Sequence, residues 1–337
     1  MRSEAAIATE TGLTLAARPD DLLASEQAAA TRPQNGAAAV HAEPVELDPE
    51  LTGDAALQRI GLACLDHVSS NKPAVLAGVE DGIHQMRVGV RRLRATLSAF
   101  GKLLPDNQRH WASEELRWLA DALGPARNLD VFETGLLQPA KQDVADRAAL
   151  EQLRQVTRRR RRVARHDAAE AVESMRYTVL MQCLRRWFDN CGWRERGHGE
   201  DLYRPIDGVA ERVLQRRWRV AKKRGKGFAT QSPDERHRLR IALKKLRYTT
   251  ESLASLYSPE KTDLFVRGLK RLQDDLGHAN DLRVAHEILA ELAPRAGPIA
   301  EAGRQVLGWH EERLDKNEPK LRNHLHELFA TEPFWRD

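Results

Sequence analysis

The sequence predicts an all-α protein, and three observations support this prediction. Charged residues make up 31% of the 337 residues and aromatic residues only 5%, a composition that suits amphipathic helices better than a β-sandwich. From about residue 52 onward, apolar residues recur at helical spacing, and the alternation typical of strands does not occur. Breaks that contain proline divide this periodic region into segments of helical length.

Taken in order, each predicted helix begins or ends at such a break or where the apolar period lapses. Ser232 is a predicted N-cap, with Pro233 at the first helical position and Glu235 at the third, a combination typical of helix starts. The predicted helices cover residues 53–78, 83–103, 107–123, 140–170, 175–190, 203–225, 234–257, 261–276, 281–293, 298–316 and 320–330.

The remaining composition argues against several classes of protein. Residues 1–50 lack a sustained apolar period, so we expect a disordered N-terminal tail. No apolar run approaches the roughly 18 residues that a membrane span needs, and no secretory signal precedes the helices. Cys64, Cys183 and Cys191 are too few and too scattered for a disulfide framework or a zinc site. We therefore expect a cytoplasmic protein without a metal, a cofactor or a membrane partner.

Two sequence motifs each occur twice in the chain, and the same number of residues separates the two copies of each. The segment HQMRVGVRRLR at 84–94 aligns with HRLRIALKKLR at 237–247, 153 positions later. Further on, LADALGPARNL at 119–129 aligns with LQDDLGHANDL at 272–282 at the same offset. Because one offset relates two separate motifs, we infer an internal repeat.

The repeat predicts two homologous helical halves, about 53–195 and 200–335. We expect a pseudo-twofold axis to relate them, so that the repeated helices face each other and build one shared surface. In each half the LG turn, at Gly124 and at Gly277, is predicted to be a helix C-cap followed by an Asn or Asp N-cap.

Each copy of the first motif forms a basic row beside an apolar face when it is placed on a helix. Met86, Val90 and Leu93 share one side of the first helix, and the His and Arg residues share a neighbouring side. Like charges at these spacings repel by a few tenths of a kcal/mol per pair, which suggests that an external anion neutralises them. The predicted anion-binding residues are His84, Arg87, Arg91, Arg94, His237, Arg240, Lys244 and Arg247, with Arg92 and Lys245 on the flanks.

The two histidines are interpreted as hydrogen-bond donors to phosphate and not as catalytic bases. Neighbouring cations should disfavour the protonated form of each until an anion binds. Two further basic runs could widen the surface, although such runs are more often solvated or paired with acidic side chains. The candidates in these runs are Arg158, Arg162, Arg216, Arg219 and Lys223.

These motifs resemble those of the CHAD family, the conserved-histidine α-helical domains, over residues 53–335. The resemblance implies two four-helix-bundle halves around a basic groove or pore that binds inorganic polyphosphate, and association with polyphosphate granules. Many relatives also carry a triphosphate-tunnel domain with an E-x-E-x-K motif, which this sequence lacks, so triphosphatase activity is not implied. The first turn reads Arg127-Asn128 where relatives often have Arg-Asp.

Two other classes of function were weighed against polyphosphate binding. A nucleic-acid-binding protein would use the same charge, but the basic rows are not interleaved with exposed aromatic or amide side chains for stacking and base recognition. A phosphoryl-transfer or hydrolytic enzyme would need a phosphate loop, a carboxylate cluster or a nucleophile with a base, and no such motif occurs. We therefore expect a binding protein that is not an enzyme.

Overall fold

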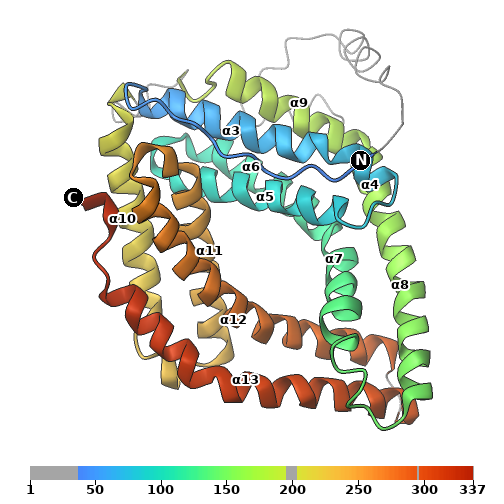
Figure 1. Ribbon diagram of the computed structural model, residues 1–337. Coiled ribbons are helices and arrows are strands. Elements are labelled where there is room, and N and C mark those ends of the chain that lie inside the picture. Colours follow the sequence, from blue (N-terminus) through green and yellow to red (C-terminus); the bar gives the residue numbers. More distant parts are fainter. Residues whose placement is uncertain (1–36, 195–202, 294–295, 337) are drawn as a thin grey trace.

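The structure is a computed structural model that describes residues 37–194, 203–293 and 296–336, and their regular elements are helices (Figure 1). The α-helices are α3 (Gly53–Ser70), α4 (Lys72–Leu76), α5 (Gly82–Ala99), α6 (Asp106–Ala122), α7 (Gly124–Val131), α8 (Arg147–Glu173), α9 (Met175–Asp189), α10 (Ile206–Gly225), α11 (Pro233–Ser252), α12 (Pro259–Leu292) and α13 (Pro298–Ala330). A π-helix, η2 (Phe132–Leu137), follows α7. The short 3-10 helices are η1 (Gly101–Leu103), η5 (Phe228–Thr230), η6 (Ala254–Leu256) and η7 (Phe334–Arg336). The all-α prediction is confirmed.

The order of the helices follows the sequence repeat. η1 and η6 start 153 positions apart, as the two motifs do, and α3 and α5 precede η1 as α10 and α11 precede η6. The segment from α6 to η2 corresponds to α12 in the same way. The twofold relation of the halves in space stays a prediction.

The helices form a frame (Figure 1). α3, α5, α6 and α9 run along one side, α7 and α8 along a second, and α12 and α13 along a third. The larger hydrophobic cluster contains side chains from both sequence halves, such as Leu65 and Leu246. The smaller cluster joins η2 and the start of α8 to the end of α12 and the start of α13. Both sequence halves therefore contribute to each cluster.

The apolar faces predicted for the two repeated helices are confirmed. Met86, Val90 and Leu93 are fully buried on α5, and Leu239 and Leu246 are fully buried on α11. The predicted start of α11 is also confirmed, because Ser232 and Glu235 cap each other. The Ser232 Oγ accepts from the Glu235 N–H at 3.3 Å, and the Ser232 N–H donates to Glu235 Oε2 at 2.8 Å.

The turn predicted at Gly277 is wrong, whereas the break predicted at Gly124 is present but falls one residue earlier, at Leu123. Gly277 lies inside α12, and Gly124 begins α7, with only Leu123 between it and the end of α6. Neither glycine has a positive φ, so neither forms the left-handed C-cap that we expected. In the first copy Pro125 lacks an N–H and interrupts the helix, whereas His278 at the matching position lets α12 continue.

Other predicted boundaries also differ from the structure, and residues 124–137, which were not predicted to be helical, form α7 and η2. The segment 53–78 is divided at Asn71, between α3 and α4. The segments 298–316 and 320–330 form the single helix α13, with Pro319 inside it. Pro319 is exposed on α13, where a lost backbone hydrogen bond can be replaced by water.

Residues 37–50 form an extended segment that packs on the helices, so the expected disorder does not hold for them. Val45 and Leu47 are each 5% exposed. The Val40 N–H donates to Asn71 Oδ1 at 3.0 Å, and the Leu47 N–H donates to Ser255 Oγ at 2.9 Å. Residues 1–36 lie outside the described part of the chain. None of the described helices has the length and apolar content to cross a membrane.

Buried carboxylates hold α8 against α7 and η2. Asp130 is 2% exposed and accepts from Arg161 at 2.5 Å and from Arg165 at 2.9 Å. Glu133 is 5% exposed and accepts from Arg154 and Arg158. Much of the arginine run of α8 is therefore neutralised inside the fold.

Replacing Asp130 with Asn should destabilise the protein strongly, because two guanidinium groups would lose their buried counter-ion. We expect the free energy of unfolding to fall by about 3 kcal/mol, measured by urea unfolding. The control is Glu312→Gln, which removes an exposed carboxylate 3.7 Å from Lys316 and should cost less than about 0.5 kcal/mol. Equal effects of the two changes would contradict the structural role of Asp130.

Candidate functional site

The two predicted basic rows meet where α5 packs against α11. Arg91 on α5 lies close enough to Arg240 and Lys244 on α11 to lower the pKa of both. Arg91 and Arg127, which lies on α7, both lower the pKa of His84. These elements border the middle of the frame in Figure 1. We call His84, Arg87, Arg91, Arg127, Arg240 and Lys244 the central cluster.

The central cluster has little internal compensation for its charge. Among the described residues, no carboxylate forms an ion pair with Arg91, Arg240 or Lys244. Asp281 on α12 is near enough to raise the pKa of Arg127, Arg240 and Lys244. Further carboxylates act at the edge of the cluster, where Asp81 and Asp130 raise the pKa of Arg127 and Asp121 raises that of Arg87. Arg91, Arg240 and Lys244 therefore lack a directly paired counter-ion in the described part of the chain.

Unused hydrogen-bond donors accompany this charge. The Nε atoms of Arg91 and Arg240 are buried and have no partner among the described residues. A buried donor without a partner costs about 1–3 kcal/mol. Arg87 is different, because its Nη1 donates to the Ala120 carbonyl oxygen at 2.6 Å. An anion with several oxygen atoms would satisfy the unused donors and the charge together.

Burial and the repulsion between neighbouring cations lower the pKa values of His84, Arg87, Arg127, Arg240 and Lys244. Burial, followed by Arg240 and Arg91, lowers the pKa of Lys244 to about 7, although Asp281 opposes this. Burial, followed by Arg127, Arg91 and Arg87, lowers the pKa of His84 to about 4. The expected loss of the protonated form is therefore confirmed for His84. Burial is also the main reason that the pKa of Arg87 falls to about 10.

The two histidines of the repeat have different surroundings. His237 Nδ1 lies 3.2 Å from the side-chain oxygen of Asn280. Asn280 occupies the same position in the repeat as Arg127, which faces His84. His237 therefore faces an amide, whereas His84 faces a cation, and the two ends of the basic surface are not equivalent.

The flanking residues do not share one location. Arg92 is 7% exposed and lies against α3, near enough to Cys64 and His67 to lower the pKa of each. It is therefore separated from the row of His84. Lys245 instead lies between helices, with its Nζ 3.5 Å from Ser98 Oγ on α5.

Arg94 and Arg247, the last residue of each row, face neighbouring acidic or aromatic groups. Asp121 and Glu114 on α6 raise the pKa of Arg94, although burial and Arg117 lower it further. Arg247 lies 3.7 Å from Glu251 and 4.9 Å from the ring centre of Tyr248.

The additional basic runs join the central cluster less than we expected. Arg158 is paired with Glu133 and Glu151, each at 3.2 Å. Arg216 donates to the Ala99 carbonyl oxygen. The side chains of Arg162, Arg219 and Lys223 are exposed. Arg158 is therefore paired with acidic side chains inside the fold, as is common for residues of basic runs.

Two cations that face the repeated helices were missed by the sequence analysis. Arg127 was read as part of a turn, but the structure places it on α7 beside His84. Arg217 was passed over in favour of Arg216, Arg219 and Lys223. Its position next to the buried Trp218 on α10 is the signal that could have marked it.

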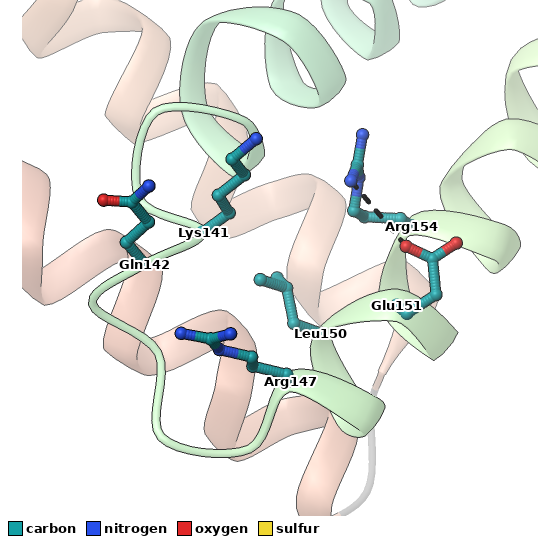
Figure 2. Close-up of a pocket in the computed structure, with 6 residues that line it drawn as sticks. All are labelled: Lys141, Gln142, Arg147, Leu150, Glu151 and Arg154. Atoms are coloured by element: carbon teal, nitrogen blue, oxygen red, sulfur yellow. Dashed lines mark ion pairs between the residues drawn. The ribbon is translucent and has the colours of Figure 1, made fainter.

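A separate pocket of about 520 Å³ lies at the start of α8 (Figure 2). Lys141, Arg147 and Arg154 line it together with Gln142, Leu150 and Glu151. Leu150 belongs to the smaller hydrophobic cluster, and Arg154 is held by Glu133 at 3.1 Å. This pocket is therefore distinct from the central cluster. No group of side chains suited to hold a metal ion occurs within the described residues.

Comparison with known proteins identifies the family. The family model of the CHAD domain matches residues 59–290, and the chain belongs to this family, which is linked to polyphosphate binding. The chain is 30% identical over 236 residues to the uncharacterized protein Rv2226 of Mycobacterium tuberculosis, with 68% of this chain and 44% of that protein covered. The match therefore spans less than half of that relative's length.

Solved structures give the same fold. The CHAD domain from the plant Ricinus communis superposes with a TM-score of 0.75 at 29% identity, covering 88% of this chain and 99% of that one. PptA from Streptomyces chartreusis has a TM-score of 0.55 at 16% identity, covering 83% and 99% of the two chains. The second likeness concerns the fold alone.

The low pKa of Lys244 depends partly on Arg240, so Arg240→Gln should raise it toward the usual value for lysine. The change removes a neighbouring positive charge that disfavours the ammonium form. The measurement is an NMR titration of labelled lysine side chains between pH 5 and pH 10. An unchanged Lys244 titration in the variant would show that the two side chains do not interact.

Proposed function

We propose that the protein binds inorganic polyphosphate at the central cluster and does so without catalysing a reaction. The observation that supports this is the meeting of Arg91, Arg240 and Lys244 from two helices, with unused guanidinium donors and without ion-pair partners among the described residues. A chain of phosphates offers closely spaced negative oxygens and no bases, which fits a site built from cations alone.

The site chemistry supports binding over catalysis. A hydrolytic or phosphoryl-transfer site needs a positioned nucleophile, a base or a metal. His84 is surrounded by cations, and with a pKa of about 4 it is a weak base at neutral pH. In its neutral form it can still donate one hydrogen bond to a phosphate oxygen. We propose a targeting or scaffolding role at polyphosphate granules in the cytoplasm.

Nucleic-acid binding is the alternative function. Both ligands are linear polyanions, so salt dependence alone does not separate them. The discriminating measurement is competition between medium-chain polyphosphate and duplex DNA for the protein at 150 mM salt. Displacement of DNA by polyphosphate supports the proposal, and the reverse result would replace it with the alternative.

Loss of two central cations should greatly weaken polyphosphate binding. For Arg91→Gln/Arg240→Gln we expect at least about a 100-fold rise in Kd at low salt, because two charge-assisted contacts are removed. The slope of log affinity against log salt should become shallower by about 1.4, at roughly 0.7 per contact. Titration calorimetry at several salt concentrations measures both quantities.

The matched control is Arg160→Gln/Arg304→Gln, which removes two positive charges from pairs with Glu291 and Glu301. This variant should bind polyphosphate within about threefold of the wild type, because long-range effects are screened by salt. Equal loss in both double variants would mean that net charge, and not the central cluster, determines binding.

Binding should also take up protons near neutral pH. The pKa of free Lys244 is about 7, and a bound polyanion favours the ammonium form and raises that pKa. Affinity is then highest below pH 7 and falls as pH rises from 7 toward the pKa of the bound state. Calorimetry at pH 8 in buffers of different ionisation enthalpy should detect the uptake.

Lys244→Arg provides the test of this assignment, because arginine stays charged throughout that range. The variant should bind polyphosphate with little proton uptake at pH 8. Uptake that matches the wild type would rule out Lys244 as its source.

A further inference from the structure

A second group of cations lies on the flank of α11 that faces α5 and α10. Lys245 on α11 reaches Ser98 Oγ on α5 at 3.5 Å. Arg217 on α10 and Arg94 on α5 are both near enough to lower the pKa of Lys245. We call Arg94, Arg217 and Lys245 the lateral cluster.

Arg217 is the least satisfied member of this cluster. Its Nε and Nη2 atoms are buried, and neither has a hydrogen-bond partner among the described residues. The preceding residue, Arg216, does have an acceptor, the carbonyl oxygen of Ala99. None of the ion pairs formed by the described residues includes Arg94, Arg217 or Lys245.

The internal repeat shows what the fold requires at this position. At the offset of 153, Arg217 corresponds to Cys64 on α3, and Ser98 corresponds to Glu251. Cys64 is fully buried, and Glu251 lies 3.7 Å from Arg247. The matching flank therefore has a small uncharged side chain and an added carboxylate. Packing of these helices does not demand an unpaired arginine, so the charge of Arg217 calls for another explanation.

The two clusters are close enough along the helices for one extended ligand. Lys244 and Lys245 are adjacent and point about 100° apart around α11. Arg91 and Arg94 are separated by about 4.5 Å along the axis of α5. A flexible chain of phosphates that contacts both clusters would have to run over the line where α5 packs against α11.

We propose that the lateral cluster is a second phosphate-binding subsite, which Arg217 completes from α10. A bound polyphosphate chain then contacts both clusters, whereas a tripolyphosphate ion occupies the central cluster. The inference rests on the proposed function of the central cluster. It adds a class of preferred ligand, a linear polyphosphate long enough to contact cations from α5, α10 and α11.

The test compares the affinities of the whole 337-residue chain for tripolyphosphate and for a polyphosphate of about 60 phosphates. In Arg217→Gln the preference for the long chain, expressed as the ratio of the two Kd values, should fall about tenfold. The salt slope for the long chain should become shallower by about 0.7, the value for one contact. Arg217→Lys retains the charge and should restore most of the preference. Arg160→Gln is the control and should leave the ratio unchanged.

Each result decides between the two proposals. If the wild type binds neither polyphosphate, the proposed function fails and the subsite fails with it. If the wild type binds both and Arg217→Gln leaves the ratio unchanged, the lateral subsite is wrong while the proposed function stands. An equal loss for both ligands would also overturn the subsite, since Arg217 would then act on the whole site. Thermal unfolding of each variant verifies that the affinities belong to folded protein.

Discussion

The concentration of positive charge between α5 and α11 is the constraint on which the rest of the structure depends. Arg91, Arg240 and Lys244 repel one another in a partly buried setting, and their repulsion must be offset by the packing of the helices that carry them. Fully buried leucines on the neighbouring apolar faces of both helices supply that packing. The empty site thus lowers the free energy of unfolding, and a bound anion should raise it.

The arginines of α8 have a different role, because they hold the helices beside the central cluster together. On α8 the guanidinium groups meet Asp130 and Glu133, which are buried on α7 and η2. Arg127 lies on the same α7, and its pKa is raised by Asp130 although burial lowers it further. The same residue type therefore serves as a structural partner of carboxylates on α8 and as an uncompensated cation on α5. The presence of a buried acid on the neighbouring helix makes the difference.

The spacing of apolar residues and the capping signals predicted those features of the fold that depend on local sequence. The apolar faces around Met86 and Leu239 and the cap at Ser232 follow from spacing alone, and so does the all-α class. Spacing gives the direction of a side chain around its own helix but not the identity of the helix that lies there. For that reason Arg92 could not be excluded from the predicted binding residues, and Arg127 and Arg217 could not be added to them. The helix end predicted at Gly277 was wrong because Gly277 and Gly124 both follow a leucine in the repeated motif. This pair of residues does not distinguish a glycine inside a helix from one near a helix end.

The extended segment at residues 37–50 and the helix α13 have a practical consequence for work on this family. The family match covers residues 59–290, yet Leu47 is bound by Ser255, and Leu321 and Leu325 of α13 belong to the larger core. A protein trimmed to the matched residues would lose this extended segment together with α13, one of the two helices along the third side of the frame, and it would expose apolar surface that promotes aggregation. The unit that folds is therefore larger than the unit that sequence similarity recognises.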